Sequence, residues 1–160
     1  MARALVALGS NLGDRARMIE AACEAICRLP RTCIAARSRP VETDPVGGPP
    51  QGKFLNGAVE IETQLEPRQL LRELLGIEKA LGRERREPQG PRTIDLDLIL
   101  YEDVVLDEAG VRVPHPRFRE RRFVLEPLAE IAPEARDPVS GKTVAELLAA
   151  LEPEGPGPGS

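Results

Sequence analysis

The hydrophobic pattern of the first half of the chain predicts a strand, a helix and two further strands. Residues 2–8 form an apolar run typical of a buried strand, and the polar segment 9–14 reads as a tight turn. Apolar residues then recur at helical spacing over about 15–29. Residues 33–43 and 54–63 read as the second and third strands, the last with partial alternation of apolar and polar positions.

The second half of the chain continues with a helix and a fourth strand. Pro67 is a favourable first residue for a helix, leucines follow at helical spacing, and Gly82 is a typical stop signal. The later elements are a strand within 90–103, a short strand and a turn over 104–116, and helices near 121–133 and 143–151.

This element order, βαββαβ, predicts a ferredoxin-like α/β sandwich of the α+β class, with helices on one face of a largely antiparallel sheet. A chain of 160 residues, 41% of them hydrophobic, suits one core, so we expect a single domain over 1–151. The tail 152–160 is rich in Gly and Pro and is expected to be disordered. The sequence has no long apolar run and no signal-peptide cleavage site, which favours a cytoplasmic protein.

The charge of the chain favours a small anionic ligand over nucleic acid. The net charge is −4, yet arginines gather in one part of the sequence. A guanidinium offers a planar fork that holds phosphate oxygens in pairs, whereas a solvated basic face is the equally weighted alternative. The clustered arginines are Arg83, Arg85, Arg86, Arg92, Arg112, Arg117, Arg119, Arg121 and Arg122.

The strand within 90–103 carries a pair of aspartates among apolar residues. Leu96, Leu98 and Leu100 alternate with Asp95 and Asp97, so the two carboxylates share one face. Their Cα atoms lie roughly 7 Å apart on a strand, and the charges repel unless an arginine or a divalent cation lies between them. Mg²⁺ often takes one or two carboxylates and completes its shell with phosphate oxygens and water. The pair therefore suggests Mg²⁺ with a nucleoside triphosphate, against the alternative of a solvated polar face.

The scarce aromatic residues and the single histidine lie near these charged segments. The chain has three Phe, one Tyr and no Trp. Phe54 follows a loop rich in Gly and Pro, and Phe123 follows the arginine run. Both are placed to stack on a flat heterocycle, with ordinary packing as the alternative. His115 lies between two prolines and is either a phosphate donor or a plain loop residue.

Five segments together resemble a known family. They are ALGSNLGDR (7–15), ETDPVGGPPQGKFLNGAVEIET (42–63), IEKALGRER (77–85), GPRTIDLDLILYEDVVLD (90–107) and VPHPRFRERRFVLEPLAEIAPE (113–134). The chain resembles the 6-hydroxymethyl-7,8-dihydropterin pyrophosphokinase family of folate biosynthesis. The resemblance implies a ferredoxin-like fold and a reaction in which ATP gives its terminal diphosphate to the pterin hydroxymethyl oxygen, leaving AMP. We expect a monomer that binds ATP and the pterin, and neither nucleic acid nor membrane.

The resemblance also implies roles for individual residues. The expected metal ligands are Asp95 and Asp97, holding two Mg²⁺ ions, and the expected catalytic residues are these two with Arg83 and Arg92. The expected ATP-binding residues are Glu78, Arg85, Arg92, Leu98, Arg112, His115 and Arg121. The expected pterin-binding residues are Thr43, Asp44, Val46, Phe54, Asn56 and Phe123.

One segment departs from the family pattern, and two other functions are less compatible with the sequence. Pro88 and Gln89 stand where the family usually carries an arginine and a tryptophan, which affects loop closure rather than the reaction. A ligand-binding sensor would not need the aspartate pair. An RNA-binding sheet is disfavoured by the acidic net charge and the few aromatic residues.

Overall fold

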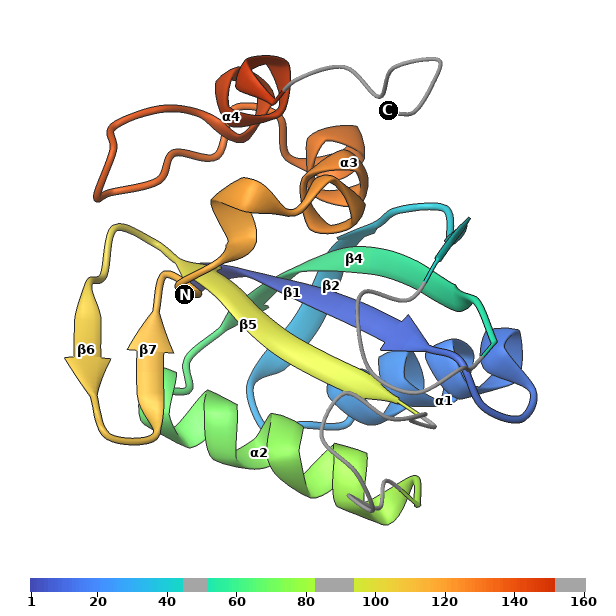
Figure 1. The fold of residues 1–160 in the computed structure, drawn as a ribbon. Helices are drawn as coiled ribbons and strands as arrows, with labels where there is room; N and C mark the ends of the chain where they lie inside the picture. The colour runs from blue at the N-terminus through green and yellow to red at the C-terminus, as the bar shows by residue number, and fades with distance from the viewer. Residues whose placement is uncertain (45–51, 83–93, 152–160) are drawn as a thin grey trace.

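The computed structural model describes residues 1–44, 52–82 and 94–151. It shows a twisted sheet with helices on both sides (Figure 1). In chain order the elements are β1 (Ala2–Ser10), α1 (Arg15–Cys27), β2 (Thr32–Arg37), β3 (Val41–Thr43), β4 (Phe54–Thr63), α2 (Pro67–Ala80), β5 (Asp95–Tyr101), β6 (Leu106–Glu108), β7 (Val111–Val113), the 3₁₀ turn η1 (Phe118–Glu120), α3 (Arg122–Ile131) and α4 (Val144–Ala150).

The main sheet has the order β2-β4-β1-β5, with the short β3 also paired to β4. All of its pairings are antiparallel. With β3 set aside, this is the strand order of a ferredoxin-like βαββαβ fold, so the predicted fold class is confirmed. The β6–β7 hairpin and the C-terminal helices are additions to that plan. No helix in the three described ranges is long and apolar enough to span a membrane.

Helices cover both faces of the sheet: α1 and α2 of the βαββαβ unit share one face as predicted, whereas α3 and α4 cover the other, which the prediction did not include. Val6 and Leu8 face the α1 and α2 side, where they join a core with Leu70. Leu5 and Ala7 face the α3 and α4 side and join a second core. The cause is visible in β1, which is apolar at consecutive positions and therefore needs cover on both faces. Figure 1 shows α1 and α2 below the sheet and α3 and α4 above it.

An extra residue in β5 changes which side chains share a face. Val6 lies opposite Leu98 and Leu5 lies opposite Leu100, so Ile99 is a β-bulge. Leu96 and Leu98 share a face as predicted, but Leu100 packs on the other side with α3. The predicted alternation of faces is therefore wrong beyond Leu98, because the bulge at Ile99 turns Leu100 to the opposite face of the sheet.

The strand predicted over 33–43 is two strands. β2 ends at Arg37 and β3 begins at Val41. Between them, Ser38 Oγ accepts a hydrogen bond from the Ala58 backbone N–H at 2.9 Å, and Pro40 has no N–H to offer the ladder. β1 is also longer than predicted: Gly9 lies in the strand and not in a turn.

The C-terminal segment is fixed by a buried ion pair. Arg119 Nε and Nη2 donate to the Asp137 carboxylate at 2.5 and 2.9 Å, and the Asp137 side chain is fully buried. Ser140 Oγ donates to the same carboxylate at 2.7 Å, and the Val139 N–H donates at 3.0 Å. Burial acts to raise the pKa of Asp137, but these hydrogen bonds outweigh it and lower the pKa to about 2. The charged pair holds the chain between α3 and α4 against η1.

Candidate active site

The two aspartates of β5 point from the same face of the sheet. Asp95 lies opposite Gly9 of β1 and Asp97 lies opposite Ala7. Directly opposed residues of an antiparallel pair project to one side. Since Ala7 belongs to the core beneath α3, both carboxylates lie on the α3 face, as the alternation in this part of the strand predicted. Both side chains are partly exposed, so a ligand on that face can reach them.

A buried glutamate supports the backbone between the aspartates. Glu78 of α2 is 4% exposed, and its carboxylate accepts a hydrogen bond from the Leu96 N–H at 2.6 Å. β5 lies at the edge of the sheet, so the backbone N–H groups on its outer side have no neighbouring strand in the sheet order to pair with. Glu78 accepts from one of these N–H groups. Leu96 stands between Asp95 and Asp97, and Glu78 therefore fixes the strand that carries both. Its expected contact with ATP stays a prediction.

A second polar group lies across β1 from the aspartates. Asn56 of β4 is opposite Gly9, and its Nδ2 donates to Thr43 Oγ1 of β3. A Cβ at Gly9 would lie 3.0 Å from Asn56 Oδ1 and 3.6 Å from the Phe54 ring. The missing side chain of Gly9 therefore leaves room for both residues over the strand. Thr43, Phe54 and Asn56 were predicted to bind the pterin, and the structure brings them together.

His115 is held by two hydrogen bonds and feels the charge of Asp97. The His115 Nδ1 accepts a hydrogen bond from the Arg117 backbone N–H at 3.2 Å, and the backbone N–H of His115 donates to the Ile99 carbonyl at 3.0 Å. Burial lowers the pKa of His115, the Asp97 carboxylate acts against that shift, and Arg121 and Arg117 add to it. A neutral ring whose Nδ1 accepts must carry its proton on Nε2. His115 is thus set to donate from Nε2, and it lies within the electrostatic reach of Asp97.

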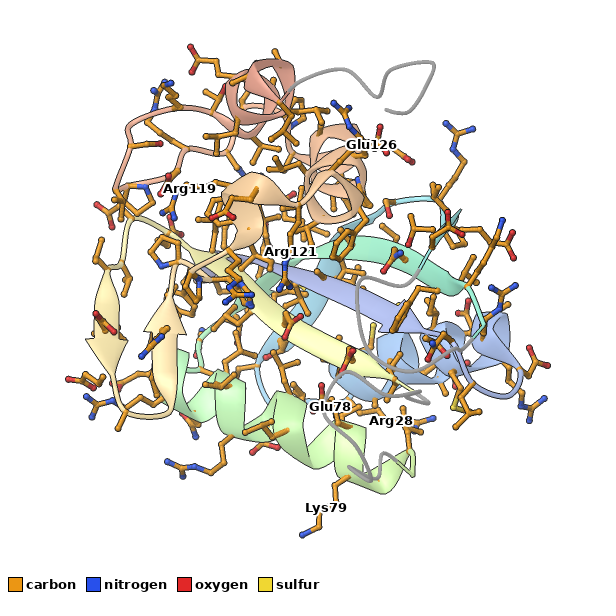
Figure 2. All side chains as sticks on the ribbon, viewed as in Figure 1. Arg28, Glu78, Lys79, Arg119, Arg121 and Glu126 are labelled. Atoms are coloured by element: carbon orange, nitrogen blue, oxygen red, sulfur yellow. The ribbon has the colours of Figure 1, made fainter. Side chains whose placement is uncertain are left out.

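The start of α3 covers the same face of the sheet. Arg121 precedes the helix, and its guanidinium carbon lies 5.7 Å from the centre of the Phe123 ring. Phe123 packs at the edge of the core beneath α3. Figure 2 shows Arg121 projecting from α3 over the strands, while Glu78 approaches β5 from α2 below. One predicted ATP residue and one predicted pterin residue are therefore neighbours.

The other predicted site residues lie at the margin of this arrangement or beyond it. The Leu98 side chain is buried in the core on the α1 and α2 side, so a nucleotide contact there has to use its backbone. Arg112 on β7 is largely exposed and lies 3.4 Å from the Asp107 carboxylate. The Asp44 carboxylate is exposed and lies 3.9 Å from Lys53 Nζ. Four predicted residues lie outside the described ranges: Arg83, Arg85, Arg92 and Val46.

Sequence reasoning missed two contributors to the site. Gly9 was assigned to a turn, although its value lies in the space that it leaves beside Asn56. Arg15 was not singled out, and it contacts both Glu42 and the Lys53 carbonyl next to the Thr43 and Phe54 pair. Neither role has a local signal, because each depends on which strands lie side by side.

Comparisons with known proteins show which family this chain resembles in sequence. The model of the family described as 7,8-dihydro-6-hydroxymethylpterin-pyrophosphokinase (HPPK) matches residues 5–133. The chain is 46% identical over 155 residues to the 2-amino-4-hydroxy-6-hydroxymethyldihydropteridine pyrophosphokinase of Methylorubrum extorquens, covering 97% of both chains. It is 44% identical over 153 residues to the enzyme of that name from Pseudomonas aeruginosa, covering 96% of this chain and 94% of the relative.

Solved structures support the fold. Wild-type HPPK-DHPS of Plasmodium falciparum with pteroate superposes with a TM-score of 0.72 at 15% identity, over 92% of this chain. The chain corresponds to 42% of that longer protein, so this likeness concerns one part of it. The family match and the near-full-length relatives carry the conclusion. The chain therefore belongs to the 7,8-dihydro-6-hydroxymethylpterin-pyrophosphokinase family, which confirms the pyrophosphokinase expected from its sequence.

Proposed function

We propose that this chain transfers the terminal diphosphate of ATP to the hydroxymethyl oxygen of 6-hydroxymethyl-7,8-dihydropterin on the α3 face of its sheet, with AMP as the leaving group. One observation carries the proposal. The Asp95 and Asp97 pair and the Thr43 and Asn56 pair project from the same face, and Gly9 of β1 lies opposite both Asp95 and Asn56. A charged site and a polar, aromatic site therefore adjoin.

Asp95 and Asp97 are the residues that would hold Mg²⁺. Among the described residues no group of three or more His, Cys, Asp or Glu is arranged to hold a metal ion. Two carboxylates suit Mg²⁺ that arrives with ATP, because phosphate oxygens and water complete its shell. When bound, two such ions would neutralise the triphosphate and lower the pKa of the attacking hydroxyl. The Glu78 contact with Leu96 keeps the two aspartates in place for that purpose.

The nucleotide side of the proposed site is built from cations and the histidine. Arg121 supplies a guanidinium over the sheet, and His115 supplies its Nε2 proton as a neutral donor to a phosphate oxygen. Arg83, Arg85 and Arg92 are proposed to act with them on the triphosphate. Phosphoryl-type transfer depends mostly on positioning and on neutralising charge, which these groups provide.

The pterin side combines hydrogen bonds with aromatic packing. Because Thr43 Oγ1 accepts from Asn56, the Thr43 hydroxyl retains its own hydrogen for a ligand, and the Asn56 amide keeps its second N–H. These groups suit the edge of a heterocycle that carries both donors and acceptors. Phe54 and Phe123 are proposed to lie against the two faces of the ring. Asp44 and Val46, at the neighbouring loop, are proposed to complete this side.

A product assay tests the proposal. Purified protein is mixed with ATP, Mg²⁺ and 6-hydroxymethyl-7,8-dihydropterin, and the nucleotides are separated. We expect pterin-dependent AMP without ADP, and its loss in Asp97→Ala. Asp103→Ala is the matched control, because Asp103 is an exposed aspartate just beyond the same strand. ADP in place of AMP, or full activity in Asp97→Ala, would contradict the proposal.

We also propose that residues 1–151 fold as one domain and that the enzyme acts as a monomer. The two hydrophobic cores share a single sheet, so neither half has a core of its own. A single unfolding transition and an elution volume for about 17 kDa, matching the 17.4 kDa chain, are the expected results.

A further inference from the structure

Asn11 and Arg15, at the junction of β1 and α1, form hydrogen bonds with residues on both sides of the segment that separates β3 from β4. Arg15, the first residue of α1, donates from Nη1 to the Lys53 carbonyl at 2.9 Å and from Nη2 to the Glu42 carboxylate at 2.6 Å. Asn11 Nδ2 donates to the Gly52 carbonyl at 3.1 Å. Glu42 lies before the loop, and Gly52 and Lys53 lie after it. One guanidinium therefore connects two points that are eleven residues apart in the sequence.

These two points adjoin the proposed pterin site. Glu42 is followed by Thr43, Lys53 is followed by Phe54, and Thr43 and Phe54 lie opposite each other in the β3–β4 pairing. Successive side chains of a strand point to opposite faces. Glu42 therefore meets Arg15 on the α1 side while Thr43 points to the α3 side. Arg15 contacts the strands from behind the site.

The contact is tight enough to restrict the position of β3. β3 is three residues long and pairs only with β4, so its own ladder holds it weakly. The hydrogen bond from Arg15 is also the main cause of a lowered pKa at Glu42, which means that the pair is charged at neutral pH. Asn11 is 7% exposed, so its hydrogen bond to the Gly52 carbonyl is largely shielded from water.

We propose that Arg15, with Asn11, is a positioning residue that sets the spacing of Thr43 and Phe54 for pterin binding. The inference rests on the proposed function, because it assumes that these two residues hold the pterin. Arg15 does not contact the substrate in this account. Its loss changes pterin affinity and leaves the nucleotide side, carried by β5 and α3, nearly unchanged.

The experiment compares binding of the two substrates in matched variants. The affinities of 6-hydroxymethylpterin and of Mg²⁺-ATP are measured by calorimetry for wild type, Arg15→Ala, Arg15→Lys, Glu42→Gln and Arg17→Ala. Arg17 lies in the first turn of the same helix and is exposed, so its variant controls for loss of a positive charge. Arg15→Ala is expected to weaken pterin binding roughly 5- to 10-fold, since it removes a hydrogen bond to the Lys53 carbonyl and an ion pair with Glu42.

The other variants separate the contributions. Glu42→Gln removes only the charge of one acceptor and is expected to weaken pterin binding about 2-fold. Arg15→Lys keeps the charge but not the fork, so it restores the Glu42 contact and recovers only part of the loss. Arg17→Ala is expected to match wild type. ATP affinity and the rate at saturating pterin should stay within about 2-fold of wild type in every variant.

Two results would overturn the inference. One is wild-type pterin affinity in Arg15→Ala. The other is an equal loss of both affinities together with a lower melting temperature, which would show that Arg15 acts on the fold as a whole. If wild type itself gives no pterin-dependent AMP and binds no pterin, the proposed function fails and the inference fails with it. Active wild type with an unimpaired Arg15→Ala rejects the positioning role alone.

Discussion

Replacement of Gly9 by alanine tests the geometry that joins the two halves of the site. Gly9 lies in β1 between Asp95 and Asn56. A Cβ added there would meet Asn56 Oδ1 at 3.0 Å, closer than an ordinary contact, so the amide must move by a few tenths of an ångström. Asn56 also donates to Thr43, and a displaced amide weakens that hydrogen bond.

Pterin affinity is expected to change more than folding stability in this variant. A neutral hydrogen bond contributes about 1 kcal/mol, so its weakening corresponds to roughly a 5-fold loss of pterin affinity. In a strand, by contrast, alanine is favoured over glycine by roughly 0.5–1 kcal/mol. Gly9→Ala should therefore bind the pterin more weakly, while its free energy of unfolding stays within about 1 kcal/mol of wild type, because the alanine gain offsets the weakened Asn56–Thr43 hydrogen bond. ATP affinity should change by less than about 2-fold.

Binding calorimetry with each substrate and denaturant unfolding measure the three quantities. Gly76→Ala is the control, because Gly76 is an exposed residue of α2 and a Cβ there would meet nothing within 4 Å. That variant should gain up to about 1 kcal/mol of stability and keep both affinities. If Gly9→Ala binds the pterin as tightly as wild type, the space above Gly9 is not part of the site and the reasoning is refuted.

Two further predictions concern protonation. The His115 Nδ1 accepts from Arg117, so its Nε2 is the donor. The amide nitrogen of His115→Gln takes the place of Nε2, so this variant should bind ATP about 5-fold more tightly than His115→Asn. Equal ATP affinities in the two variants would contradict this tautomer. The pKa of Asp137 is lowered to about 2, so its stabilising contribution is present above its unfolded pKa of about 3.8 and is lost as the pH falls toward 2. In urea unfolding, the difference in free energy of unfolding between wild type and Asp137→Asn should shrink by about 2 kcal/mol from pH 5 to pH 2. If the free energies of both proteins change in parallel with pH, the ion pair of Asp137 with Arg119 is not the source of the pH dependence.

The sequence was sufficient for the parts of the fold that follow from local pattern. The alternation around Asp95 and Asp97 predicted a shared face, and the structure confirms it up to Leu98. The bulge at Ile99 was not predictable, because the residues around it are all apolar and one inserted residue leaves the pattern unchanged. The second helical layer had a signal in the consecutive apolar residues of β1, which a strand with one solvated face would not carry.

The candidate site also contains features that a local sequence pattern could predict and others that it could not. Glu78 lies one helical turn after Leu74, within the apolar stripe of α2, so a carboxylate on a buried face was a visible anomaly. The partners of Arg15 are 27 and 38 residues away, and no spacing rule connects them. Such contacts depend on tertiary packing, which places α1 beneath the β3–β4 pair.

The position of Gly9 explains why the two halves of the site can serve one reaction. Asp95, Gly9 and Asn56 form a row across three neighbouring strands. Strands lie about 4.8 Å apart, so Asp95 and Asn56 are separated by about 10 Å at their Cα atoms, with Gly9 between them. Because Gly9 has no side chain, the Asn56 amide and the Phe54 ring lie directly over β1. The residues proposed to bind the pterin therefore extend from β4 toward the aspartate pair on β5, as the proposed diphosphate transfer requires.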